Sequence, residues 1–258
     1  MTLPSELREA LDGYLGTRVR SGESGARVYR LMRKGRRTLY LKQGAGRVAR
    51  QVLGEVVRLQ WLNDHFPSPR VRRFGGDGRS AWMLTEALPG RPAYECLAAG
   101  AGSRVETVRA IAGFMRRLHG LPVETCPFQG DHRIRMAQAR SNIEAGVVDV
   151  EDFDEQRRGW TAKRVWSELK AMIPTRFERV VTHGDFSLDN VLIDRGRVTG
   201  MIDVGRLGVA DRYQDVAILW NNLAEFGAGL QRVFLMEYGV RRLDRRRLDF
   251  HLCLDEFF

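Results

Sequence analysis

Three polar residues, Asp185, Asn190 and Asp203, lie close together around two apolar runs, at residues 191–193 and 198–202. The runs have the composition of strands, and the Asp-Arg-Gly sequence between them is typical of a turn. A hairpin of this kind would hold the polar side chains at fixed separations. One acid placed to accept a proton, with an amide and a second acid placed to bind a divalent cation, is the equipment for phosphoryl transfer to a hydroxyl. The segment therefore predicts that chemistry.

The same segment resembles the aminoglycoside phosphotransferases, and above all the 3'-phosphotransferases, in three short motifs. These are His-Gly-Asp at residues 183–185, Asp-x-x-x-x-Asn from Asp185 to Asn190, and Ile-Asp-Val-Gly-Arg at residues 202–206. Each motif alone is weak, because an Asp in a turn after a strand is usually a turn residue or a helix cap. The resemblance depends on their combination in this order.

The resemblance implies a fold and an activity. The fold would be α+β, a bilobal protein-kinase-like fold with a small antiparallel β-sheet lobe and a larger, mainly helical lobe. The activity would be that of an aminoglycoside O-phosphotransferase that moves the γ-phosphate of ATP to the 3'-hydroxyl of kanamycin/neomycin-type antibiotics and so confers resistance. ATP and Mg²⁺ would be the cofactors, and a small-molecule aminoglycoside the substrate.

The pattern of apolar residues along the chain agrees with two lobes, residues 1–86 and 87–258. Apolar spacing predicts a helix over residues 3–15, a strand hairpin at 28–32 and 38–42, a helix over 47–64, and strands at 71–74 and 81–85. The expected buried face of the second helix includes Val52, Val56 and Leu59. Further helices are predicted over residues 104–119, 131–145, 155–171, 211–226, 228–238 and 242–255.

The strand-rich lobe is where a nucleotide would bind. In kinase-like enzymes a Lys of the third strand binds the nucleotide phosphates, and a Glu of the following helix holds it. Lys42 and Glu55 occupy these two contexts. Tyr40 lies on the same strand face as Lys42 by the period of two. The resemblance implies that Tyr40 stacks on adenine, and a core aromatic is the alternative.

Two further segments complete the expected nucleotide site. The Gly/Ser-rich loop at residues 21–27 would cover the phosphates, with Ser24 as the expected side-chain contact. The connector after the last strand, represented by Thr85 and Ala87, would supply backbone hydrogen bonds to the adenine edge. A Gly/Ser loop between strands needs no function, so the loop assignment rests on the resemblance.

On the acceptor side, the resemblance implies that Asp185 is the catalytic base, which accepts the proton of the attacking hydroxyl or orients that hydroxyl. Asn190 and Asp203 would hold Mg²⁺. His183 is interpreted as a structural residue of the loop. Arg206 would orient Asp185 or line the acceptor site.

Acidic residues indicate what the acceptor is. Residues 149–155 contain five acids and no base, and the chain ends in Leu-Asp-Glu-Phe-Phe. Acids also gather at helix N-termini because of the helix dipole, which is the alternative reading. An aminoglycoside is a polycation, and its recognition requires several carboxylates. The resemblance assigns this role to Asp152, Asp154, Glu155, Glu225, Asp255, Glu256 and the carboxylate of Phe258. Asn222 departs from relatives that carry an acid there, which puts the range of drugs in doubt.

Composition restricts the other possibilities. The 258 residues are 43% hydrophobic and 29% charged, as in ordinary globular proteins. No apolar run reaches the roughly 18 residues that span a bilayer, and the charged N-terminal segment does not suit a signal peptide, so we expect a cytoplasmic protein without a membrane partner. Three distant cysteines without CxxC spacing argue against a disulfide framework or a zinc site.

The net charge of +10 raises nucleic acid as a partner. The arginines look scattered, with one tight triplet at residues 245–247, and no nucleic-acid-binding signature accompanies them. We therefore predict a solvated basic surface, no nucleic-acid partner and a monomer, with a homodimer as the alternative.

Two alternative functions remain at this stage. The same fold could phosphorylate another small hydroxylated acceptor, such as streptomycin, a macrolide or a choline-like metabolite, although the acidic tail argues against macrolides. An inactive RNA-binding pseudokinase is the other, and the presence of Lys42, Glu55 and Asp185 argues against it.

Overall fold

The structure is a computed structural model that describes residues 7–19, 25–100 and 102–258. The chain divides into two compact units. The first unit comprises Met1–Pro89 together with Thr199–Gly205, and the second comprises Gly90–Val198 and Arg206–Phe258. The sequence analysis placed the boundary at residues 86/87, whereas this division falls after Pro89 and returns a short later segment to the first unit.

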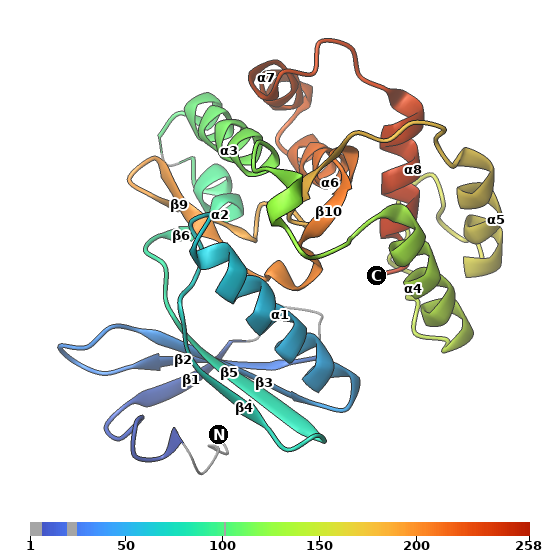
Figure 1. Ribbon diagram of the computed structural model, residues 1–258. Helices are drawn as coiled ribbons and strands as arrows, with labels where there is room; N and C mark the ends of the chain where they lie inside the picture. Colours follow the sequence, from blue (N-terminus) through green and yellow to red (C-terminus); the bar gives the residue numbers. More distant parts are fainter. Residues whose placement is uncertain (1–6, 20–24, 101) are drawn as a thin grey trace. The chain divides into compact units, whose positions relative to one another are not determined.

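The first unit contains a five-stranded antiparallel sheet and one long helix, α1 (Figure 1). The strand order is β1-β2-β3-β5-β4. The bounds are β1 Leu15–Val19, β2 Arg27–Met32, β3 Leu39–Ala45, α1 Arg47–Asn63, β4 Val71–Gly76 and β5 Ser80–Glu86. The predicted β2–β3 hairpin, the helix and the two later strands are confirmed.

The start of the chain differs from the prediction. Residues 7–13 form turns in place of the end of a helix, and β1 begins at Leu15. Leu11 donates its N–H to the Leu7 carbonyl at 2.9 Å, and both side chains are buried. Gly13 then adopts a φ of 73°, which ends helical geometry. Leu7 and Leu11 thus have helical spacing and buried side chains, but they belong to a single turn that packs on the sheet.

The side-chain alternation of β3 separates the core from the nucleotide side of the sheet. Leu39 and Leu41 join a buried cluster with Leu7 and Leu31. Successive strand residues point to opposite faces, so the even-numbered residues of β3, such as Tyr40, point away from this cluster. These residues are half-buried. The predicted buried face of α1 is confirmed, with Val52, Val56, Leu59 and Leu62 all buried.

The second unit is mainly helical (Figure 1). Its helices are α2 Ala93–Ala98, α3 Arg104–His119, α4 His132–Glu144, α5 Ala162–Met172, α6 Tyr213–Ala224, α7 Ala228–Tyr238 and α8 Arg245–Asp255. Helix α5 starts later than predicted, because Gly159 has a φ of 77° and Thr161 caps the helix by accepting the N–H of Arg164. In the part of the chain that the structure describes, no helix is long and apolar enough to cross a membrane.

The later part of the chain also contains short strands, most of which belong to the second unit. Strand β7 (Arg179–Thr182) pairs antiparallel with β10 (Gly208–Asp211), which the sequence analysis had missed. Strands β6 (Arg91–Pro92), β8 (Val191–Asp194) and β9 (Arg197–Met201) form a three-stranded sheet. The hairpin predicted from the two apolar runs is thus β8 and β9.

Candidate active site

In the first unit, Lys42 lies between two carboxylates. Its Nζ donates to Glu55 Oε2 at 2.8 Å and also to Asp203 Oδ1. Burial alone lowers the pKa of Lys42, but the charges of Glu55 and Asp203 outweigh it and raise that pKa. The ammonium group therefore keeps its charge at any physiological pH. The structure brings these three predicted residues together.

Asp203 has an unusual backbone for a non-glycine residue. Its φ is 56°, in the left-handed region, at the point where β9 has ended and a 3-10 turn (Val204–Arg206) begins. Left-handed non-glycine residues cost of order 1–3 kcal/mol and cluster at functional sites. The side chain is 51% exposed, so one carboxylate oxygen remains accessible to a ligand while the other binds Lys42.

In the second unit, hydrogen bonds fix the loop that carries Asp185. The N–H groups of His183 and Gly184 donate to the buried Asp215 carboxylate at 2.7 and 2.8 Å. Burial alone would raise the pKa of Asp215, but hydrogen bonds from His119 and His183 lower it. The anchor thus remains a carboxylate. Sequence analysis missed Asp215, although its Arg-Tyr-Gln-Asp context at the start of α6 was a visible signal.

Further contacts set the direction of the loop. Gly184 has a φ of 86°, and a Cβ there would lie 2.4 Å from the Arg206 carbonyl oxygen, so glycine is required. Asp185 donates its N–H to His183 Nδ1 at 3.2 Å, and its carbonyl accepts from Asn190 Nδ2 at 2.9 Å. The Asp185 side chain is 36% exposed. The backbone is held while the carboxylate faces outward.

Arg206 lies beside Asp185, as predicted. Its Nη1 is 3.9 Å from Asp185 Oδ2, and its guanidinium carbon is 4.8 Å from the centroid of the Phe258 ring. A second guanidinium, that of Arg135, lies 4.4 Å from the same centroid. Arg135 is buried and donates to the Gly184 carbonyl at 2.9 Å and to Asp255 Oδ1 at 3.1 Å. The C-terminal residues are therefore packed against the loop of Asp185.

Two of the predicted substrate-binding acids form a pair. The N–H of Asp154 donates to both Glu256 oxygens, at 3.3 and 3.2 Å. Burial, and then the Asp154 carboxylate, raise the pKa of Glu256 to about 7. Buried Arg157 bonds to Asp154 and lies 3.4 Å from Glu256. Asp152 and Glu155 are exposed in the same region.

Arg157 and Arg135 were not foreseen, because nothing local in the sequence marks a buried arginine. They alter the expected acidic surface, since they already neutralise part of its charge. Asp255 is paired with Arg135, and the Asp154–Glu256 pair with Arg157.

Glu225 and Asn222 lie at the end of α6. Glu225 Oε1 accepts from the Tyr94 hydroxyl at 2.8 Å, and Asn222 Oδ1 accepts from the Leu188 N–H at 3.0 Å. Burial, and then the charges of Glu95 and Glu225, raise the pKa of Asp189 nearby. Because Asn222 accepts the N–H of Leu188, its side chain stabilises the loop that contains Leu188.

One backbone donor of the connector has a partner within the first unit. The N–H of Ala87 donates to the Thr38 carbonyl at 3.0 Å, and the expected backbone contact of the connector with adenine stays a prediction. The sheet continues one residue further than the sequence suggested and uses this donor. Thr85 is buried in β5, Tyr40 is half-buried on the Lys42 face, and Ser24 lies outside the described residues.

Comparisons with known proteins show which family the chain belongs to. The model of the phosphotransferase enzyme family matches residues 16–251. An aminoglycoside 3'-phosphotransferase of Escherichia coli is 48% identical over 99% of this chain and 95% of its own length. The chain belongs to the aminoglycoside 3'-phosphotransferase family.

Solved structures of relatives extend the likeness to the fold. A type VIII aminoglycoside-3'-phosphotransferase has a TM-score of 0.88 and 41% identity, covering 98% of this chain and 97% of its own. A complex of the phosphotransferase APH(3'')-Id from Streptomyces rimosus with ADP and streptomycin has a TM-score of 0.80 and 28% identity, covering 92% and 94%. The kinase-like α+β fold and the aminoglycoside phosphotransferase activity expected from the sequence are confirmed.

Proposed function

We propose that this aminoglycoside 3'-phosphotransferase uses Asp185 to direct the 3'-hydroxyl of a kanamycin/neomycin-type drug onto the γ-phosphate of ATP. The observation that carries the proposal is the Asp185 loop. Its backbone is fixed by Asp215, His183 and Asn190, and its carboxylate remains exposed. A positioned carboxylate that accepts or orients a hydroxyl proton contributes roughly 10²- to 10⁴-fold to rate.

Lys42 would bind the phosphates of ATP. Glu55 holds its ammonium group from α1, so the charge is already oriented when the nucleotide arrives. Tyr40, on the same face of β3, would contribute a flat surface for adenine.

Asn190 and Asp203 would hold Mg²⁺. Carboxylate and amide oxygens are the hard ligands that this ion prefers, and the strained, half-exposed Asp203 is consistent with a ligand role. Groups of three or more His, Cys, Asp or Glu placed for a metal do not occur among the described residues, so substrate phosphates and water would complete the coordination. When bound, the ion supplies positive charge that offsets the charge on the transferring phosphoryl group.

The acids of the second unit would bind the ammonium groups of the drug. Asp152, Glu155 and Glu225 carry exposed or partly exposed carboxylates, and Glu256 would ionise fully when an ammonium group approaches. The added phosphate inactivates the drug for a simple reason. It brings about −1.5 to −2 charges to a ligand that binds RNA through positive charge. We expect the enzyme to act as a monomer in the cytoplasm, where ATP is available.

The test is a reaction of the purified protein with ATP, Mg²⁺ and kanamycin, followed by NMR to locate the phosphate. We expect a 3'-phosphate, and phosphate at another position would contradict the proposal. Streptomycin belongs in the same assay, because a relative of similar fold binds it. A higher kcat/KM for streptomycin would favour that acceptor.

Asp185→Asn tests the base. We expect kcat to fall by about 10²- to 10⁴-fold with an unchanged circular dichroism spectrum and Tm. Asp149→Asn, another acid of the second unit, is the matched control and should leave kcat unchanged. Near-wild-type turnover by Asp185→Asn would rule out the base assignment.

A further inference from the structure

The positive charge is concentrated in the first unit. Residues 1–89 and 199–205 contain 17 Lys and Arg against 9 Asp and Glu, a net charge of +8 out of +10. The one arginine triplet noted in the sequence lies in the second unit, where Arg247 is buried against Asp211 and Glu178. The net charge is therefore uneven, because the first unit has few acids to balance its basic residues, and this excess of positive charge needs an explanation.

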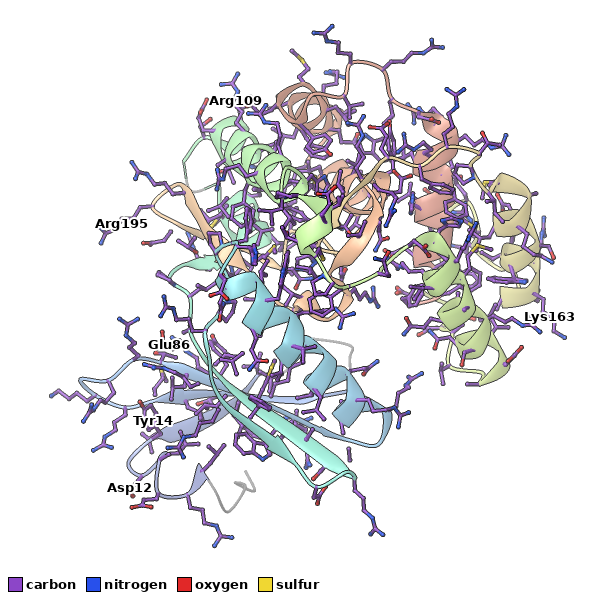
Figure 2. All side chains as sticks on the ribbon, viewed as in Figure 1. Asp12, Tyr14, Glu86, Arg109, Lys163 and Arg195 are labelled. Atoms are coloured by element: carbon purple, nitrogen blue, oxygen red, sulfur yellow. The ribbon has the colours of Figure 1, made fainter. Side chains whose placement is uncertain are left out.

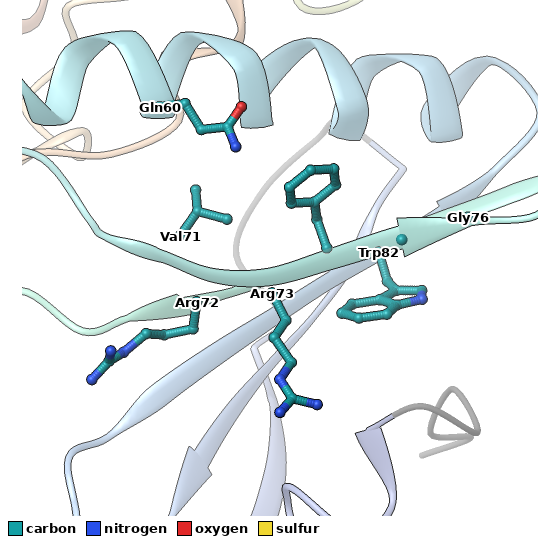
Figure 3. A pocket seen from close by; sticks show the side chains of 8 residues that line it. Gln60, Val71, Arg72, Arg73, Gly76 and Trp82 are labelled. Atoms are coloured by element: carbon teal, nitrogen blue, oxygen red, sulfur yellow. The ribbon is translucent and has the colours of Figure 1, made fainter.

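A β-bulge places two consecutive arginines on one side of the edge strand β4. The register of β4 against β5 shifts between Val71 and Arg73, which pair with Thr85 and Leu84. A bulge leaves one extra residue on its strand and redirects the side chains beside it. Figure 3 shows Arg72 and Arg73 together on the side of β4 opposite Val71. Regular pleating would have sent them to opposite faces.

Arg72 borders a charged hollow. It has a volume of about 420 Å³ and is lined by Arg37, Arg70, Arg72 and Glu86. Glu86, at the end of β5 (Figure 2), lies 3.4 Å from Arg37 and 2.5 Å from Arg72. One carboxylate thus faces three guanidinium groups. Within the described part of the chain, Arg70 and Arg73 form no ion pair. The hollow has two uncompensated positive charges, which suits a phosphate group.

A second hollow adjoins the first and shares Arg72. Its volume is about 560 Å³, and its lining includes Gln60, Arg73, Phe74 and Trp82 (Figure 3). Phe74 is 48% exposed, although it lies within a strand. Arg73 and Phe74 line this hollow from opposite faces of the edge strand β4, so a single strand that wraps around the edge can contact both side chains. An exposed ring can stack on an unpaired nucleic-acid base, because every base has a flat face.

We propose that the edge of the sheet formed by Arg37, Arg70, Arg72, Arg73 and Phe74 is a binding surface for single-stranded nucleic acid. The arginines bind consecutive backbone phosphates, and Phe74 stacks on a base. The surface consists of residues of the first unit alone and includes none of the residues assigned to phosphoryl transfer. It replaces the expectation, drawn from the sequence, of a merely solvated basic surface.

The test is fluorescence anisotropy of the full-length protein with labelled oligo-uridine and oligo-deoxythymidine of about 12 nucleotides. Excess ADP is present to fill the nucleotide site. We expect binding at about 50 mM salt that weakens steeply towards 200 mM. In Arg72→Gln/Arg73→Gln, the affinity should fall about tenfold or more, and the slope of log K against log salt should fall by about 0.7 for each lost phosphate contact.

The matched control is Arg241→Gln/Arg242→Gln, which removes the same charge from two exposed arginines of the second unit. It should bind as the wild type does. Phe74→Leu should weaken oligonucleotide binding at least about fivefold, and leave the affinity for inorganic polyphosphate unchanged. All three variants should phosphorylate kanamycin normally.

Four results would overturn the proposal. They are absence of binding at low salt, equal loss in both arginine variants, equal affinity for a duplex, and no effect of Phe74→Leu. Equal loss would mean that net charge alone drives the interaction. A preference for RNA over DNA, or the reverse, would identify the natural form of the partner and support the proposal.

Discussion

The guanidinium of Arg206 lies against the ring of Phe258, 4.8 Å from its centroid. The same guanidinium is 3.9 Å from the carboxylate of Asp185, and Arg135 approaches the ring at 4.4 Å. Phe258 was expected to act through its terminal carboxylate. Its ring has a second task, because it holds a cation beside the proposed base. Phe258 is thereby connected to the proposed chemical step as well as to the proposed drug binding.

Phe258→Leu keeps the terminal carboxylate and removes the aromatic ring. Two cation–π contacts are worth about 1–2 kcal/mol together, so we expect kcat to fall roughly 5- to 30-fold. The KM for drug should change less. Steady-state kinetics with kanamycin measures both, and Phe258→Tyr, which keeps a ring, should restore kcat. A change confined to KM would show that the ring only binds drug.

Glu55→Gln removes the charge that holds Lys42 from α1. Asp203 would then be the remaining carboxylate partner of Lys42, and we expect the KM for ATP to rise more than the KM for drug. The control is Glu144→Gln, an exposed acid of α4 that forms a surface ion pair with Arg140. If the two KM values of Glu55→Gln rose equally, the nucleotide role of the pair would be wrong.

Asp215→Ala would remove the acceptor of two backbone N–H groups in the Asp185 loop. Each unsatisfied buried donor costs about 1–3 kcal/mol, so Tm should fall by several degrees and kcat should fall with it. Thermal unfolding and turnover below Tm measure the two effects separately. Asp249→Ala, at an exposed position of α8, should change neither. Full activity in Asp215→Ala would mean that the loop holds its shape without this anchor.

The pH dependence of drug binding should follow the titration of the Glu256 carboxyl group. Its pKa of about 7 is raised from the ordinary 4.5, so protonation near neutral pH removes an ammonium-binding charge. We expect the KM for drug to rise as pH falls through about 7, and Glu256→Gln to flatten this dependence. If Glu256→Gln kept the wild-type pH profile, another group would be responsible.

The same shift has an opposite effect on stability. Between pH 4.5 and about 7 the folded protein holds a proton on Glu256 that the unfolded chain has released. The contribution of this residue to the free energy of unfolding therefore decreases as pH rises through that window. Glu256→Gln should lose this part of the pH dependence, as measured by Tm from pH 4.5 to 8.

Local patterns predicted the local structure well. The alternation in β3 placed Tyr40 and Lys42 on one face, and the apolar spacing of α1 placed Glu55 within reach of Lys42. The helix predicted over residues 3–15 was wrong for residues 7–13, because Gly13 has a positive φ that ends the helical geometry after the turn from Leu7 to Leu11. Residues 3–6 of that prediction lie outside the described residues. Family resemblance supplied what periodicity could not, namely which polar residues meet.

Long-range ion pairs were the part that the sequence could not predict. Arg135 and Asp255 are 120 residues apart, and Arg157 and Glu256 are 99 residues apart. No period or motif links such positions. The acids could be recognised as a group, but their pairing and the resulting pKa of Glu256 depend on how α4, α8 and the loop before α5 fold together.

The return of Thr199–Gly205 to the first unit has a consequence for recombination. Lys42 finds its carboxylate partner Asp203 far along the chain, and Met201 donates its N–H to the Pro67 carbonyl. A chimera that exchanged only residues 1–89 between two relatives would join the lysine of one parent to the aspartate of the other. The first unit, where we propose that the nucleotide binds, is therefore not a contiguous segment of the chain, and an exchange that preserves it must include both of its segments.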